Sequence, residues 1–238
     1  MLSPAAQHRQ QHDVQLQVQR EQATHDAPIV APVSEEHAAG NDYRLMRIRL
    51  DDDARRLASI RSRDRANQMK HSILPHYWNY CSAVISRNTT KPDSVITRVC
   101  IWCFDIGEIS NGLLLAEFAL GRYLTKPDGY RHTQSPAGFK RNLAEILAET
   151  LADTVLKNQT PHSAANHLWH LMELVKQHDI TDHINAKLHR AYAMAVVSTD
   201  PATAIQHYTE SERLRPLASN RKVISRLEKQ KEIRHETE

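Results

Sequence analysis

Apolar side chains that recur three and four residues apart constrain the fold of this chain more than any other feature of its sequence. This spacing runs through residues 73–85, 95–106, 109–123, 139–156, 163–177 and 182–214. It is the period that places apolar residues on one face of an α-helix. Glycine is rare, with 6 in 238 residues, which argues against the many tight turns of a β-sandwich or barrel. The sequence therefore predicts an all-α fold.

Two stretches of the chain follow a helix–turn–helix pattern that resembles tetratricopeptide repeats, whose period is about 34 residues. In the first, the pattern consists of Ile96, Val99, Cys100 and Cys103, a turn at Gly107-Glu108, and the close-packing positions Gly112, Ala116 and Ala119. In the second, it consists of Leu188, Ala191, Tyr192 and Ala195, a turn at Asp200-Pro201, then Ala204, Tyr208 and a closing Pro216. The alternative interpretation is a generic helical bundle in which this spacing is coincidental. Both alternatives are all-α.

The composition changes along the chain and divides it into four segments. Residues 1–40 hold seven Gln, four His and three Pro but few large apolar side chains, so we expect a disordered arm. Residues 41–70 are densely charged with a narrow apolar stripe, which is typical of an amphipathic helical segment that needs a partner. Residues 71–215 carry the helical-hairpin core, with a loop over 125–138. Residues 216–238 form a basic, helical tail.

Positive charge is concentrated at two places. Residues 44–70 hold nine Arg and Lys against four Asp, a net charge of 9 − 4 = +5. Residues 213–234 hold eight Arg and Lys against two Glu, a net charge of 8 − 2 = +6. Since the whole chain carries only +3, the remainder is acidic. Basic helical stretches are the electrostatic pattern expected for contact with phosphate, although a solvated helix face is the alternative.

These two segments supply the candidate DNA-binding residues. The first segment is favoured for reading DNA, because arginines at helical spacing can reach base edges in a major groove. The same segment could instead, or in addition, hold subunits together, with the tail binding DNA. The nine candidates are Arg55, Arg56, Arg61, Arg63, Arg65, Lys70, Arg221, Lys222 and Arg226.

The positions of the cysteines and the lengths of the apolar runs indicate the cellular compartment in which the protein is expected. All three cysteines, Cys81, Cys100 and Cys103, lie in apolar runs, which suits a reducing compartment better than a disulfide framework. The first residues show no charged region followed by an apolar stretch, as a secretory signal would. The longest apolar runs fall far short of the roughly 20 residues of a membrane helix. We expect a soluble intracellular protein with no membrane contact.

Several stretches in the same order resemble the small terminase subunit of temperate bacteriophages of the Peduovirus type. They are Leu2-Ser3-Pro4-Ala5, Ile73-Leu74-Pro75-His76-Tyr77-Trp78, 101–109, Ala116-Glu117-Phe118-Ala119-Leu120, Ala186-Lys187-Leu188-His189 and 200–214. The resemblance implies a protein that binds viral double-stranded DNA at the packaging end site. It also implies a homo-oligomeric ring, delivery of DNA to the large terminase ATPase, and a location in the cytoplasm of the bacterial host.

The family is often described as the terminase endonuclease subunit, which makes an enzyme the alternative. Metal-dependent cleavage needs carboxylates that converge on Mg²⁺, and the candidates are Asp105 with Glu108 and the run 51–53. Asp105 and Glu108 are interpreted first as helix-end residues, since Asp caps helices and Glu favours a first turn. No nuclease pattern and no glycine-rich phosphate loop is present. We therefore expect no cofactor, with Mg²⁺ only if the endonuclease alternative holds.

Histidine and cysteine pairs also suggest metal binding, but weakly. His167 and His170 lie three apart with His162 nearby, yet no further ligand completes a zinc set, so a surface or interface role is expected. Cys100 and Cys103 form a Cys-x-x-Cys pair, but both occupy inward helical positions and are expected in the core. We therefore predict no metal site.

A third possibility for the function of the whole chain, beside DNA binding and DNA cleavage, is a helical-repeat adaptor that does not bind DNA.

Overall fold

The computed structural model describes residues 35–88, 93–122, 141–158 and 162–236. Contacts divide the chain into two units, Met1–Asp42 and Tyr43–Glu238. Of the first unit only residues 35–42 are described, and they form the beginning of a helix. The packing described below is that of the second unit.

All regular elements in the described ranges are helical, which confirms the all-α prediction. The two short elements labelled η are 3₁₀ turns. In chain order the elements are α2 (Glu35–Ala58), α3 (Arg63–Ile73), η1 (Leu74–Tyr77), α4 (Trp78–Ser86), α5 (Ser94–Ile106), α6 (Ile109–Arg122), α7 (Leu143–Asn158), η2 (His162–Ala164), α8 (Ala165–Val175), α9 (Asp182–Val196), α10 (Pro201–Leu214) and α11 (Ala218–Glu236).

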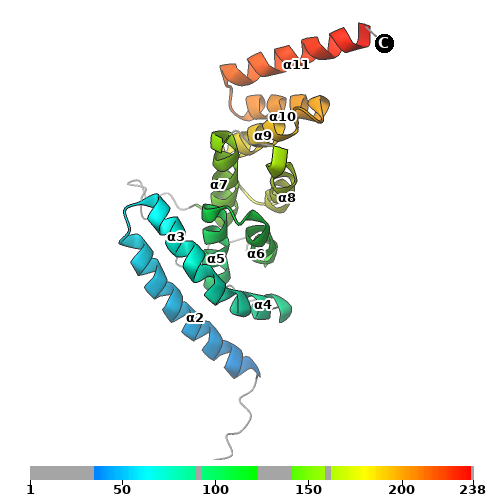
Figure 1. Ribbon diagram of the computed structural model, residues 1–238. Helices are drawn as coiled ribbons and strands as arrows, with labels where there is room; N and C mark the ends of the chain where they lie inside the picture. The colour runs from blue at the N-terminus through cyan, green and yellow to red at the C-terminus, as the bar shows by residue number, and fades with distance from the viewer. Residues whose placement is uncertain (1–34, 89–92, 123–140, 159–161, 237–238) are drawn as a thin grey trace, which may run out of the picture. The chain divides into compact units, whose positions relative to one another are not determined.

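The core of the second unit is built from successive helix pairs (Figure 1). Helix α5 packs against α6, and α9 packs against α10, so the two predicted hairpins exist. Helix α7 packs on α5, α8 and α9, α8 also packs on α6 and α9, and α11 packs on α10. Each helix thereby buries its apolar face against a neighbour. That these hairpins are tetratricopeptide repeats stays a prediction.

The boundaries of α5 follow from residues at its two ends. Asp93 precedes the helix, and its carboxylate accepts hydrogen bonds from the backbone N–H groups of Val95 (2.8 Å) and Ile96 (3.0 Å). These two donors have no partner inside the helix, so the aspartate stabilises the first turn. The helix ends at Gly107, whose φ of +83° lies in the left-handed region that favours glycine. The turn that follows leads directly into α6.

Gly112 lets α5 and α6 approach closely, as the repeat pattern predicted. A Cβ atom at this position would lie 2.6 Å and 2.7 Å from two ring carbons of Phe104, and 3.3 Å from the Cβ of Cys103. Phe104 itself is buried, so its ring has little room to move. Ala116 and Ala119, the other two small residues of the pattern, are fully buried. The sequence pattern therefore identified this helix contact correctly.

The stretch 73–85 is not the single helix that its periodicity predicted. Helix α3 ends at Ile73, a 3₁₀ turn covers Leu74–Tyr77, and α4 begins at Trp78. Pro75 explains the break, because proline has no N–H to continue the α-helical bonding and clashes with the preceding turn. The break places Tyr77 in the core, where its hydroxyl donates to the Asp53 carboxylate (2.8 Å).

Helix α7 starts later than its periodicity suggested, at Leu143, because Asn142 caps it. The Asn142 side-chain oxygen accepts from the backbone N–H of Glu145 (2.8 Å), and the Glu145 carboxylate accepts from the N–H of Asn142 (3.3 Å). This reciprocal pair is a capping box. Glu145 also accepts from the backbone N–H of Thr181 (3.2 Å), just before α9. The cap therefore fixes the start of α7 relative to that of α9.

Some predictions lie outside the described residues. The arm over 1–40 is described only from Glu35, where α2 already begins, and the loop over 125–138 is not described. The segment boundaries after residues 40, 70 and 215 stay predictions. Within the described ranges, no helix combines the length and apolar character that crossing a membrane requires.

Candidate nucleic-acid interface

Four of the five arginines of α2 are paired with aspartates of the same helix. Arg55 lies 3.2 Å from the Asp52 carboxylate, and Arg56 lies 3.2 Å from that of Asp53. Asp53 is buried, whereas Arg55 and Arg56 are exposed. Both arginines are candidate DNA-binding residues, and their charge is balanced by a neighbour one helical turn away. Ion pairs at this spacing are the ordinary i, i+3 pairs of a helix surface.

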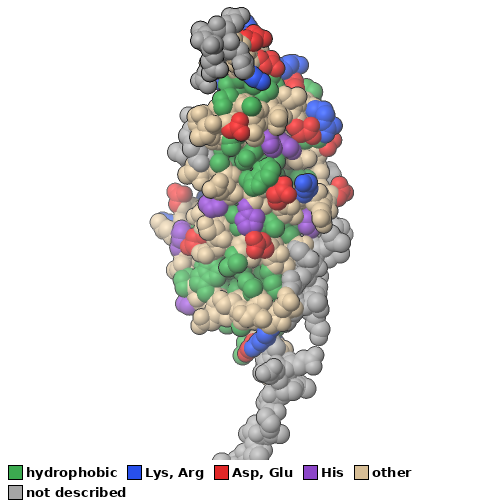
Figure 2. Space-filling model, turned by 90° about the vertical axis from the view of Figure 1, so that its right-hand side faces the viewer, with side chains coloured by type: hydrophobic (Ala, Val, Ile, Leu, Met, Phe, Trp, Pro, Cys, Tyr) green, Lys and Arg blue, Asp and Glu red, His purple; other side chains and the backbone are tan. Residues whose placement is uncertain are grey.

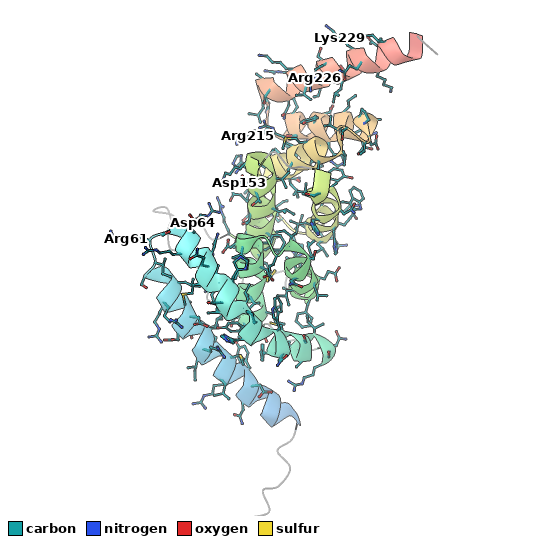
Figure 3. The ribbon with its side chains drawn as sticks, viewed as in Figure 1. Arg61, Asp64, Asp153, Arg215, Arg226 and Lys229 are labelled. Atoms are coloured by element: carbon teal, nitrogen blue, oxygen red, sulfur yellow. The ribbon has the colours of Figure 1, made fainter. Side chains whose placement is uncertain are left out.

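The turn between α2 and α3 presents cations without such partners. Arg61, Arg63 and Arg65 are all exposed, and the ion pairs among the described residues involve the arginines of α2 but none of these three. Ser62 caps α3 through a hydrogen bond from the N–H of Arg65. Figure 3 places Arg61 and Asp64 at this end of α3. We call Arg61, Arg63 and Arg65 the turn cations.

Lys70 is placed differently from the turn cations. Its ammonium group lies 2.8 Å from the Asp105 carboxylate on α5, and its side chain is only 14 % exposed. The pair ties α3 to α5 across 35 positions of sequence. Removing a half-buried ion pair in order to reach phosphate would leave Asp105 without its partner. The structure therefore gives Lys70 a packing contact that its place in a basic run did not suggest.

Helix α11 carries three cations on the side away from the core. Asn220 and Leu227 are buried, with Val223 and Ile224 partly buried beside Leu227. Lys222, Arg226 and Lys229 are exposed and lie four and three residues apart, on a common face. Arg226 and Lys229 can be followed on α11 in Figure 3. We call Lys222, Arg226 and Lys229 the α11 cations.

Arg221, the ninth candidate, points to a different side of α11. It lies 3.4 Å from the Glu212 carboxylate at the end of α10. Lys229 was counted in the basic tail but not named as a candidate, although its spacing of three from Arg226 could have identified it. The described part of the chain thus brings five of the nine candidates to exposed positions without an ion pair: Arg61, Arg63, Arg65, Lys222 and Arg226.

Asp105 and Glu108, two of the carboxylates proposed for catalysis, contact side chains of α3. Asp105 lies in the last turn of α5 and binds Lys70, so its interpretation as a helix cap was wrong; Asp93 caps that helix. Glu108 accepts from the Asn111 side chain (3.1 Å) and lies 3.7 Å from His71. In the described residues, no group of three or more His, Cys, Asp or Glu side chains is arranged to hold a metal ion.

The histidines and cysteines that suggested metal binding have other surroundings. His167 shares a hydrogen bond with Ser110 (3.1 Å), and His170 lies 2.6 Å from the Glu117 carboxylate, so both join α8 to α6. Figure 2 shows a face on which histidine and hydrophobic side chains mix with carboxylates, while Lys and Arg are few. Cys100 and Cys103 are fully buried, as predicted, and burial raises the pKa of both thiols.

A histidine pair that sequence reasoning missed joins α9 to α10. The Nδ1 atoms of His189 and His207 lie 2.9 Å apart, and the two rings are partly buried. Tyr192 packs its ring edge against His207. Burial, followed by the neighbouring His207, lowers the pKa of His189 to about 4, and burial also lowers the pKa of His207. The residues are 18 apart in sequence, so no local pattern indicates the contact.

This pair makes the stability of the fold depend on pH. Because the folded-state pKa of His189 lies below its ordinary value of about 6.5, the unfolded chain binds a proton first as pH falls. We expect the free energy of unfolding to be highest above about pH 6.5 and to decrease down to about pH 4. Urea unfolding at several pH values measures this. His189→Asn should flatten the dependence of the unfolding free energy on pH. His76→Asn, at an exposed histidine, should leave this dependence unchanged. If the unmodified chain and both variants show the same dependence, the His189–His207 pair is not its cause.

In the part of the chain that the structure describes, these observations define an all-α protein with two exposed cationic surfaces. A comparison with protein-family models matches residues 47–183 to the family described as the phage small terminase subunit. The match covers more than half of the chain, and the chain belongs to this family. It is also similar to the "Terminase, endonuclease subunit" of Escherichia phage P2, with 28% identity over 236 residues, covering 97% of this chain and 86% of that protein. No solved structure matches the chain significantly.

Proposed function

We propose that this chain binds double-stranded viral DNA at the packaging end site and delivers it to the large terminase subunit, the ATPase of packaging. The observation that carries the proposal is the exposure of the turn cations and the α11 cations without ion pairs among the described residues. Unpaired arginine and lysine side chains are free to bind phosphate and release its counterions. Membership of the family supplies the role in packaging.

The proposal includes a homo-oligomeric ring in the cytoplasm of the bacterial host. Leu45 and Ile48 support a contact between subunits, because they are 65 % and 59 % exposed and lie one turn apart on α2. Large apolar side chains that face solvent on neighbouring turns are candidates for burial against another protein. In a ring, each subunit would add its cations to the same duplex, so phosphate contacts would multiply.

The test is binding of end-site duplex and of an unrelated duplex over a series of salt concentrations, with the mass of the free protein measured in parallel. We expect binding at low salt and a logarithmic slope of about −0.9 for each phosphate neutralised. Preference for the end site would support recognition, and a mass above that of one chain would support a ring. Absence of binding to either duplex at low salt would favour the adaptor instead.

DNA cleavage by this chain is the second candidate function, because the relative from phage P2 carries the words "endonuclease subunit" in its name. Asp105 and Glu108 would be its carboxylates, with Mg²⁺ as the metal. Both side chains are about one-third exposed, at 31% and 34%. Lys70 already compensates the charge of Asp105, and Glu108 accepts a hydrogen bond from Asn111, which favours a packing role over metal binding.

A nicking assay with Mg²⁺, with and without the large subunit, separates binding from cleavage. We expect no cleavage by the chain alone, and we expect Asp105→Ala to reduce stability by about 1–3 kcal/mol because Lys70 loses its half-buried partner. Circular dichroism establishes whether the variant is folded. Cleavage by the unmodified chain that disappears in a folded Asp105→Ala variant would establish the enzyme.

A further inference from the structure

The aspartate run of α2 pairs with four arginines of the same helix. Asp53 serves two of them, Arg49 at 4.0 Å and Arg56 at 3.2 Å. The others are Arg47 with Asp51 at 3.3 Å and Arg55 with Asp52 at 3.2 Å. All four pairs span three or four residues of the helix, although Arg47 also donates to Ser94 of α5 and Asp53 also accepts from Tyr77. The basic character of α2 is therefore largely cancelled along the helix itself.

Two of the three carboxylates have no contact that the fold requires. Asp53 is 4 % exposed and accepts a hydrogen bond from the buried Tyr77 hydroxyl. Asp51 and Asp52, in contrast, have side chains that are 56 % and 55 % exposed. Among the described residues, their side chains bond only to arginines of α2. Asp51 and Asp52 are therefore free to serve a function other than stabilising the fold of the monomer.

A carboxylate beside an arginine opposes the approach of phosphate in two ways. The guanidinium must first give up its partner, which costs about 0.2–1 kcal/mol for an exposed pair. The carboxylate then remains close to the phosphate and repels it, and screening by salt weakens this only beyond about 8–10 Å. Helix α2 leads directly into the turn that carries Arg61. A duplex bound at the turn cations would thus meet a neutralised helix beside them.

We propose that Asp51 and Asp52 mask Arg47 and Arg55, so that these two arginines of α2 add little to the contact that the turn cations and the α11 cations make with duplex DNA. The inference rests on the proposed function, because it concerns the same binding reaction. Its consequence is selectivity: an α2 helix with Arg47 and Arg55 unmasked would bind a duplex of any sequence more tightly, whereas the masked helix adds little affinity for DNA of arbitrary sequence. Asp51 and Asp52 are therefore specificity-determining residues of the DNA surface.

The test compares the Asp51→Asn/Asp52→Asn variant with the unmodified chain on an unrelated duplex. We expect the variant to bind about 5–20-fold more tightly at low salt and its logarithmic salt slope to steepen by about 1–2, since each unmasked arginine adds a phosphate contact. The matched control is Glu117→Gln/Glu173→Gln. It removes the same charge from two exposed carboxylates, one beside His170 and the other ion-paired with Lys176, and should change affinity less than about 2-fold.

Substitution of Arg55 tests whether the loss of its carboxylate partner causes the gain in affinity for DNA. Its side chain is 78% exposed, so Arg55→Gln leaves the fold intact. In the unmodified chain this substitution should leave affinity nearly unchanged, because Arg55 is masked. In the Asp51→Asn/Asp52→Asn background it should reverse about half of the gain. A gain that persists in full without Arg55 would mean relief of repulsion alone, and it would overturn the masking.

The outcomes separate this inference from the proposed function. If the unmodified chain binds DNA and the double variant binds no more tightly than the control, masking is wrong and DNA binding stands. If only the double variant binds, masking is supported and the proposed function fails. If neither protein binds at low salt, both are overturned, because unmasked arginines should have created binding.

Discussion

Replacing Lys222, Arg226 and Lys229 by glutamine is expected to weaken binding to duplex DNA by about 10–100-fold near 0.1 M salt, and to make the salt slope less steep by about 3 units. These side chains share one exposed face of α11, opposite the residues that pack on α10. Each would neutralise one phosphate, so their loss removes three counterion-release steps. Replacing the turn cations Arg61, Arg63 and Arg65 should have an effect of the same order.

A third triple variant tests whether the affinity for DNA depends on these two surfaces or on the net charge of the protein. Arg55, Lys157 and Lys176 are 78 %, 67 % and 71 % exposed, and each is paired with a carboxylate three or four residues before it in the chain. Their replacement by glutamine removes the same total charge but should weaken binding less than about 3-fold. Mobility shifts over a salt series compare all three triple variants. Equal losses in all of them would show that charge alone, rather than these two surfaces, determines the affinity.

Gly112→Val is expected to lower the free energy of unfolding by about 1–3 kcal/mol or more, because the added carbons overlap the Phe104 ring. For a domain of this size each kcal/mol corresponds to about 2–4 °C in melting temperature. Gly112→Ala should also destabilise the fold, although alanine favours a helix interior by about 1 kcal/mol relative to glycine. Thermal unfolding followed by circular dichroism measures both variants.

Gly40 provides the control for this experiment. It also lies in a helix, α2, but a Cβ atom there would meet nothing within 4 Å. Gly40→Ala should therefore leave the melting temperature unchanged or raise it, by up to about 1 kcal/mol in stability. Should Gly112→Ala stabilise the protein as Gly40→Ala does, the close approach of α5 and α6 would be wrong.

The helices were predictable because their signals are local. The apolar spacing of 95–106 and 182–214 predicted α5, α9 and α10, since a helix buries one face whatever covers it. The single helix predicted over 73–85 was wrong because Pro75 acts through its own missing N–H and ring, and periodicity alone does not weigh that effect. The start of α7 was missed for a similar reason, because Asn142 and Glu145 form a cap that apolar spacing does not detect.

The candidate site was predictable in part. The two concentrations of positive charge, and the exposure of Arg61 and Arg226, agree with the basic runs of the sequence. The pairing of Arg55 with Asp52 was also accessible, since three residues separate them on one helix. The pairing of Lys70 with Asp105 and of Arg221 with Glu212 was not, because each joins two different helices.

The sequence by itself determined that the chain is helical, where the hairpins of α5–α6 and α9–α10 lie, and how much charge each end carries, because these properties depend on residues within a few turns of one another. Only the tertiary structure decided which cations remain available and which histidines meet. Lys70 reaches Asp105 across 35 residues, and His189 reaches His207 across 18. Such contacts depend on how whole helices pack, and no local spacing encodes that packing.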